Sequence, residues 1–170
     1  ALIDFADSEL YKSGKESDLA ASKMDEGILS ILQLLEIHPK NDREQRIVNF
    51  LSAAGMYMAC CDQDTMSQKW DLLYDWLSDY TTQPELYLQF DSQEAIVNKT
   101  KQICNLFAKE ASDDVFQLLE RIIGITLMDG RLEKEEKKRL YEISGMMNVS
   151  QDAMNLTIKR VSETYLTPNR

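Results

Sequence analysis

Five carboxylates could bind a metal ion, and they fall in two short segments that each follow an apolar stretch. Asp62 and Asp64 belong to the first segment. Asp129, Glu133 and Glu136 belong to the second. Carboxylate oxygens are ligands that calcium and magnesium prefer in proteins. A helix that starts near Glu133 would place Glu133 and Glu136 on one face, close to Asp129. The sequence therefore predicts a candidate site for a divalent cation of the calcium or magnesium type.

The two glutamates also suit a purely structural role at the start of a helix. Negative charge at that end interacts favourably with the helix dipole, by ~0.3–1 kcal/mol per residue. An EF-hand is excluded by spacing, because its twelfth loop position requires a glutamate. Counted from Asp62, that position is Leu73. Counted from Asp129, it is Leu140. From the residues alone, the structural role is favoured over a cation site.

The histidine and the cysteines do not form a catalytic or zinc-binding pattern. His38 is the only histidine, so histidines cannot build a metal triad or a proton relay. Cys60, Cys61 and Cys104 fit neither a disulfide framework nor zinc-ligand spacing, and we expect them to be reduced and buried. A nucleophile, a base and an orienting group are not visible together. We therefore expect a protein that is not an enzyme, and a small metal-dependent hydrolase ranks last among the functions considered.

The charge of the chain favours some partners over others. Its 170 residues carry 29 acidic and 19 basic side chains, a formal net charge of −10. No nucleic-acid partner is expected, because affinity for nucleic acid rests on cations that neutralise phosphates. A divalent cation or a basic protein surface suits the balance better. The longest apolar run, near residues 28–37, is too short to span a membrane, and no signal peptide is visible. A cytoplasmic location is therefore expected.

Apolar residues recur at helical spacing along the chain, and no alternating strand pattern of useful length occurs. Only six glycines and three prolines interrupt it. This predicts an all-α single domain of about seven to eight helices, the first over residues 18–36. Each later helix is expected to begin at a capping residue or at a proline. The expected starts are Asn41 or Asp42, Ser67, Pro84, Ser92, Ser112 with Asp113 and Asp114, and Ser150.

Residues 115–149 predict two helices that meet at a corner. An apolar helix is expected to end at Asp129-Gly130. Gly130 suits a left-handed backbone conformation, which costs a residue with a side chain ~1–2 kcal/mol. An acidic helix follows from Glu133, and Gly145 is expected to close it. Within that helix, Glu133 with Lys137 and Glu135 with Arg139 are expected to pair four residues apart.

The two acidic segments suggest an internal repeat. Asp62 placed over Asp129 gives an offset of 67 residues (129 − 62), which also places Leu73 over Leu140. Each unit would be a helix, an acidic turn and a helix, over residues 43–80 and 113–145. A chance likeness between two amphipathic helix pairs explains these matches almost as well. Both interpretations stay open.

Residues 122–149 resemble the tellurite-resistance TerB-like family, which includes the N-terminal part of the DjlA-type co-chaperones. The matching elements are an apolar helix, the Asp129-Gly130 turn, Glu136, and a helix that ends near Gly145 before a cap at Ser150. The resemblance implies an all-α fold with pseudo-repeated halves and an acidic, metal-binding surface. It also implies a role in tellurite resistance or general chemical stress, with membrane-associated or calcium-binding partners. In the first turn, Lys69 or Trp70 stands where the family pattern has an acid.

Two hypotheses for function follow. Residues 1–17 are expected to form an N-terminal arm, and residues 18–166 a TerB-like domain. In the first hypothesis, this domain is a non-enzymatic stress-response module whose acidic turns bind a divalent cation or a basic protein partner. That partner could hold the domain at the inner membrane. In the second hypothesis, the domain binds a partner helix without metal, in an apolar groove lined by methionines. The chain has eight methionines, including Met56, Met58, Met146 and Met147, for which core packing is the simpler interpretation.

Overall fold

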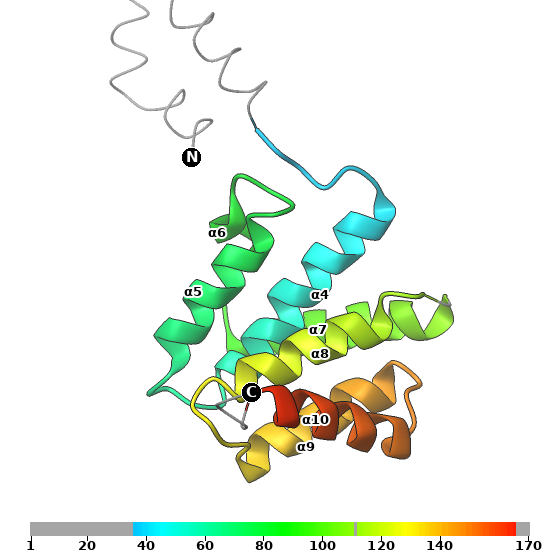
Figure 1. Ribbon diagram of the computed structural model, residues 1–170. Coiled ribbons are helices and arrows are strands. Elements are labelled where there is room, and N and C mark those ends of the chain that lie inside the picture. The colour runs from blue at the N-terminus through cyan, green and yellow to red at the C-terminus, as the bar shows by residue number, and fades with distance from the viewer. Residues whose placement is uncertain (1–35, 111, 166–170) are drawn as a thin grey trace, which may run out of the picture.

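Seven α-helices form the part of the chain that the computed structural model describes, residues 36–110 and 112–165 (Figure 1). They are α4 (Asp42–Ala59), α5 (Met66–Leu77), α6 (Pro84–Tyr87), α7 (Gln93–Lys109), α8 (Val115–Thr126), α9 (Lys134–Met146) and α10 (Gln151–Tyr165). No strand occurs in these residues, so the all-α prediction is confirmed. The predicted arm over residues 1–17 and nearly all of the predicted helix over residues 18–36 lie outside the described residues.

Helix α4 is the centre of the bundle. It packs against α5, α7 and α8, and it also contacts α6 and α9 (Figure 1). Eleven of its eighteen residues are buried, including the small residues from Ser52 to Gly55. A Cβ atom at Gly55 would lie 2.4 Å from Cδ2 of Leu73 on α5. Glycine at this position therefore lets the two helices approach closely.

The expected helix caps are largely confirmed. The side chains of Asn41, Ser92 and Ser150 accept hydrogen bonds from backbone N–H groups three residues later, at 3.0–3.1 Å. Pro84 occupies the first position of α6. Asp114 departs from the prediction, because its carboxylate receives two hydrogen bonds from the Arg43 guanidinium, at 2.8 and 2.9 Å, instead of capping α8.

The end of α9 differs from the sequence prediction. Gly130 has a φ of +87°, as expected for the corner after α8. The prediction that Gly145 closes α9 is wrong, because α9 continues to Met146. Asn148, with a φ of +61°, adopts the left-handed conformation after the helix. Asparagine tolerates that conformation better than most residues, which explains how the chain turns without a glycine.

The methionines mostly fill the core, as the simpler interpretation predicts. Met56, Met58 and Met147 are at most 5% exposed. Of the four methionines considered for a partner groove, only Met146 is partly exposed. Three of these four methionines are turned inward and do not line a groove, and the methionine-lined groove of the second hypothesis stays a prediction. None of the described helices is long and apolar enough to cross a membrane.

Candidate functional site

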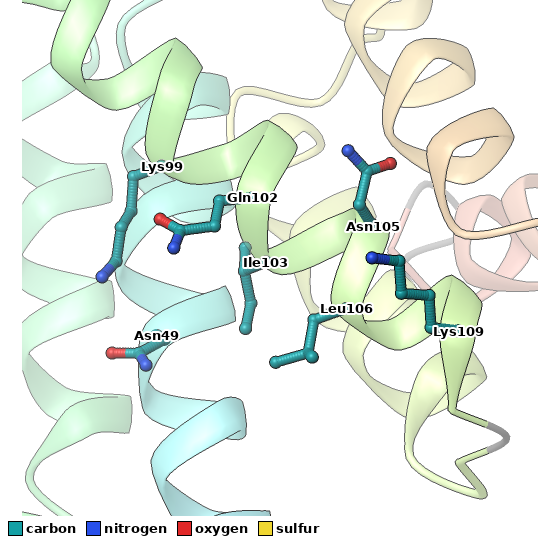
Figure 2. A pocket seen from close by; sticks show the side chains of 7 residues that line it. All are labelled: Asn49, Lys99, Gln102, Ile103, Asn105, Leu106 and Lys109. Atoms are coloured by element: carbon teal, nitrogen blue, oxygen red, sulfur yellow. The ribbon is translucent and has the colours of Figure 1, made fainter.

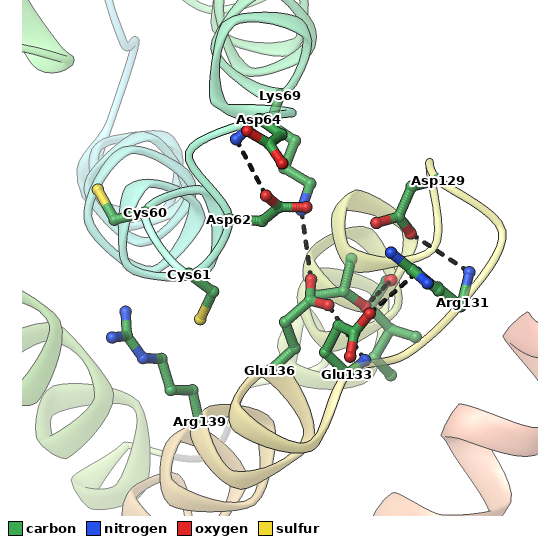
Figure 3. Close-up of polar contacts among 12 residues, drawn as sticks. Cys60, Cys61, Asp62, Asp64, Lys69, Asp129, Arg131, Glu133, Glu136 and Arg139 are labelled. Carbon is green, nitrogen blue, oxygen red and sulfur yellow. Dashed lines mark hydrogen bonds and ion pairs between the residues drawn. The ribbon is translucent and has the colours of Figure 1, made fainter.

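The two acidic turns lie against each other and are joined by a buried ion pair. Nζ of Lys69, on α5, is 3.3 Å from Oε2 of Glu136, on α9 (Figure 3). The two side chains are 0% and 1% exposed. A buried charge is tolerated when an opposite charge and hydrogen bonds compensate its loss of water. The pair therefore fixes how the first turn sits on the second.

Glu136 uses both of its carboxylate oxygens inside the protein. While Oε2 accepts from Lys69, Oε1 accepts a hydrogen bond from the backbone N–H of Glu133, at 3.1 Å. Glu133 is the residue that precedes α9, so this bond satisfies one of the amides that a helix start leaves free. Both carboxylate oxygens of Glu136 are therefore occupied by contacts within the protein.

The other four carboxylates lie on the outside of the two turns. They belong to Asp62, Asp64, Asp129 and Glu133. Oδ1 of Asp62 accepts a hydrogen bond from the N–H of Asp64, at 3.0 Å. Oδ1 of Asp129 accepts one from the N–H of Arg131, at 3.2 Å. The Arg131 side chain pairs with Glu133 at 2.9 Å, in place of the Lys137 partner that the sequence predicts. Asp62 and Asp129 therefore each stabilise their own turn. Figure 3 shows the two turns facing each other, with Lys69 and Glu136 between them.

This geometry bears on the cation site that the sequence predicts at Asp62, Asp64, Asp129, Glu133 and Glu136. In residues 36–110 and 112–165, no three His, Cys, Asp or Glu side chains lie close enough together to hold a metal ion. The ammonium of Lys69 takes the place beside Glu136 that a cation would need. The calcium- or magnesium-type site stays a prediction without a converged set of ligands in the described part of the chain.

Sequence reasoning missed the central role of Lys69. In the sequence pattern, Lys69 stands out only because the TerB-like family has an acid near this position. The proposed repeat could have indicated this contact. Lys69 and Glu136 are 67 residues apart, which is the offset that relates Asp62 to Asp129. The ends of α4 and α8 also lie 67 residues apart, and the starts of α5 and α9 lie 68 apart. Equivalent positions of the two proposed units therefore contact each other.

The adjacent cysteines lie beside the corner in surroundings that disfavour thiolates. Burial raises the pKa of the Cys61 thiol to about 11, and nearby Arg139 lowers it only in part. Burial also raises the pKa of Cys60. Figure 3 shows the two sulfur atoms on different sides of the chain. Because the thiolate is the reactive form, these cysteines are poorly suited to redox or nucleophilic chemistry.

Arg139 holds α9 against the end of α4. Its guanidinium donates a hydrogen bond to the backbone oxygen of Tyr57, at 2.7 Å, and lies 4.5 Å from the centre of the Tyr57 ring. It also forms the predicted ion pair with Glu135, at 3.4 Å. The Tyr57 hydroxyl donates to Glu142 at 2.8 Å. Burial and this carboxylate raise the pKa of Tyr57 to about 12, so the tyrosine stays protonated.

The described residues form open clefts, and one of them has no catalytic groups gathered in it. One cleft of about 410 Å³ lies along α7, where Lys99 and Lys109 are joined by amide side chains such as Gln102. Figure 2 shows that the two lysine side chains extend in different directions and do not converge. This lining contains no acid, histidine or cysteine. It therefore has no base with which to activate a nucleophile.

Comparisons with known proteins found no relative. No protein-family model, no curated protein and no solved structure matches the chain.

Proposed function

We propose that this chain is a non-enzymatic helical interaction module that binds a basic segment of a protein partner. In keeping with the TerB-like resemblance of residues 122–149, we place that partner in a stress-response assembly. The acidic corner, defined as Asp62, Asp64, Asp129 and Glu133 around the Lys69–Glu136 pair, is the part of the module that attracts the partner.

One observation carries the proposal: the corner keeps a cation inside and its acids outside. Lys69 is fully buried, and the carboxylate of Glu136 neutralises its charge. Asp64, Asp129 and Glu133 are exposed, and Asp62 is half-buried. Arg131 pairs with Glu133, and exposed Lys134 follows, so these two cations offset only part of the charge of the four acids. The outward field of the corner is therefore negative, which favours encounter with a basic surface.

A basic side chain suits this arrangement better than a metal ion does. A calcium or magnesium ion needs several oxygens converging on one point. Lysine and arginine need only a nearby carboxylate, and their long side chains can reach acids that are spread over two turns. The acids of the corner are spread in this way. A basic protein segment is accordingly the ligand that we propose.

Binding of a labelled peptide tests this function. The probe is a synthetic helical peptide of Ala, Lys and Arg, and its affinity for the full chain is measured by fluorescence anisotropy. We expect the triple variant Asp62→Asn/Asp64→Asn/Asp129→Asn to bind about tenfold or more weakly. We also expect binding by the unchanged chain to weaken steeply between about 0.05 and 0.2 M salt, because exposed charges are screened.

A matched control separates the corner from net charge. Asp42, Asp113 and Asp152 are exposed, and the first two lie at the opposite ends of α4 and α8 from the corner. Their triple change to asparagine alters the net charge equally and should leave affinity within about twofold. Equal weakening by both triples would overturn the proposed site. A melting temperature that rises with calcium or magnesium at constant ionic strength, and does so only when Asp129 is intact, would assign the corner to a metal instead.

A further inference from the structure

Helix α5 lies at the edge of the bundle and presents one face outward. Its main contacts are with α4 and α6, and Figure 1 shows it beside α4 at the margin of the fold. Lys69, Leu73 and Leu77 are the buried residues of α5. On the other side, Asp71 and Asp75 are exposed. This outer face begins directly after the acidic corner.

The outer face of α5 carries a row of acids without cations. Asp71 and Asp75 lie one turn apart on α5, Asp79 follows four residues later in the turn after the helix, and all three are exposed. Lys69 is the only basic residue of the helix, and it is buried. Among the described residues, none of the three aspartates forms an ion pair. This row therefore places three exposed negative charges on α5 and the turn that follows it.

These acids oppose the stability of the helix that carries them. Like charges four residues apart repel each other on a helix surface. Asp75 lies in the last turn, where the helix dipole disfavours negative charge, and that turn has no basic residue. Within the described residues, no ion pair of these aspartates offsets this loss of helix stability. Features that break local rules without an internal gain are expected where a protein binds something else.

An aromatic pair lies within the same face. The rings of Trp70 and Tyr74 are 5.4 Å apart, and Tyr74 is 37% exposed between Asp71 and Asp75. Two other aromatic rings carry an arginine: Arg139 lies over Tyr57, 4.5 Å from the ring centre, and Arg121 lies over Trp76 of α5, at 5.1 Å. No such cation covers Trp70 or Tyr74 from the described residues. An aromatic face flanked by carboxylates is a favourable seat for a lysine or arginine.

We propose that the outer face of α5 and the turn after it, formed by Asp71, Tyr74, Asp75 and Asp79, are the docking surface for a basic amphipathic helix of a protein partner. This inference rests on the proposed function and gives it a second contact region. Cations at every fourth position of the partner helix match the spacing of the aspartates, and one of them stacks on Tyr74. An anionic membrane surface is not the partner, because it would repel this row.

Two peptides and two triple variants test the docking surface. The first peptide carries Lys or Arg at every fourth position of an Ala-based helix, and the second has the same composition in scrambled order. We expect Asp71→Asn/Asp75→Asn/Asp79→Asn to weaken binding of the first peptide about tenfold or more, and the unchanged chain to prefer the first peptide over the second. Melting of the free variant should occur at the same temperature as the parent or higher, which shows that it is folded.

The outcomes separate this inference from the proposed function. If the α5 triple variant and the corner triple variant both bind the peptide more weakly than the parent, the docking surface and the proposed function are both supported. Weakening by the corner triple alone keeps the proposed function and overturns the docking surface. Weaker peptide binding by the α5 triple variant alone supports the docking surface and shows that the acidic corner does not bind the peptide. If neither variant binds the peptide more weakly, the docking surface and the proposed function are both overturned.

The tyrosine provides an independent readout. Tyr74→Leu keeps an apolar side chain but removes the aromatic face, so we expect it to weaken the spaced peptide about threefold or more. Tyr74→Phe keeps the ring and should restore binding to within about twofold of the parent. Equal affinity for all three chains would remove Tyr74 from the surface and show that charge alone recruits the peptide.

Discussion

The ammonium of Lys69 and the carboxylate of Glu136 cost free energy to bury, and that cost is offset only while both are present. Breaking such a pair by removing one partner leaves an uncompensated charge inside the protein. Glu136 adds a second role, because its other oxygen holds the N–H of Glu133 at the start of α9. A single residue thus links the packing of two turns to the beginning of a helix.

We expect Lys69→Met to lower the free energy of unfolding by about 3–5 kcal/mol, because it strands the Glu136 carboxylate. Glu136→Gln retains an oxygen for the N–H of Glu133 and removes the charge. The double variant should therefore recover most of the stability that Lys69→Met loses. Urea denaturation followed by circular dichroism measures each free energy, and the double-mutant cycle gives the coupling.

The exposed pair between Arg131 and Glu133 provides the control. Arg131 is 75% exposed on its side chain, so Arg131→Met should cost no more than about 1 kcal/mol. A loss of less than about 1 kcal/mol for Lys69→Met would mean that water or a rearranged side chain reaches Glu136, and the view of a sealed pair would have to be abandoned.

At the scale of helices, two glycines that both lie inside helices have different roles. Gly55 is buried in α4, and a Cβ there would meet Leu73 of α5 at 2.4 Å. Gly145 is exposed in α9, and a Cβ there would have no heavy atom within 4 Å. The first glycine is required by the packing of two helices, whereas the second leaves α9 weaker than an alanine would.

Alanine at these two positions should have opposite effects on stability. Gly145→Ala should raise the free energy of unfolding by about 0.5–1 kcal/mol through helix propensity. Gly55→Ala should lower it by about 1–3 kcal/mol, because Leu73 is fully buried and has little room to move. Thermal melting of both variants decides the matter. Stabilisation by Gly55→Ala would show that Leu73 can adopt another rotamer, and that close approach is not what selects the glycine.

Helix starts could be predicted from the sequence because they depend on neighbours along the chain. Asn41, Ser92 and Ser150 bond to amides three residues later, so local pattern was sufficient. The end of α9 was mispredicted because Gly145 and Asn148 both suit a left-handed turn, and packing decides between them. Lys69 could not be placed by local pattern, since its partner lies 67 residues away and its charge suggests a surface position.

At the scale of the molecule, ion pairs join helices that are far apart in the sequence, while other acids face outward. Arg43 reaches Asp114 across 71 residues, and Lys69 reaches Glu136 across 67. Arg160 of α10 pairs with Glu120 of α8. Meanwhile the row Asp71, Asp75 and Asp79 faces outward without such partners in the described residues. The chain therefore combines attractive pairs at its helix contacts with repulsion across its outer surface.

The net charge of −10 makes repulsion the larger of these effects, so added salt should stabilise the folded chain. The Debye length falls from about 30 Å at 0.01 M to about 8 Å at 0.15 M ionic strength, which screens surface charges more than buried pairs. We expect the melting temperature in calorimetry to rise by about 2–4 °C over this range.

The two triple variants then locate the repulsion. Neutralising Asp71, Asp75 and Asp79 should raise the melting temperature at low salt and reduce the gain from added salt, because these neighbouring charges repel one another. Neutralising Asp42, Asp113 and Asp152 changes the net charge equally but removes acids from the starts of helices, where the dipole favours them, so it should lower the melting temperature instead. A melting temperature that falls as salt is added would mean that the pairs between helices outweigh surface repulsion. In that case the acids of α5 would no longer be a strain on the free protein, and a partner would not be needed to explain them.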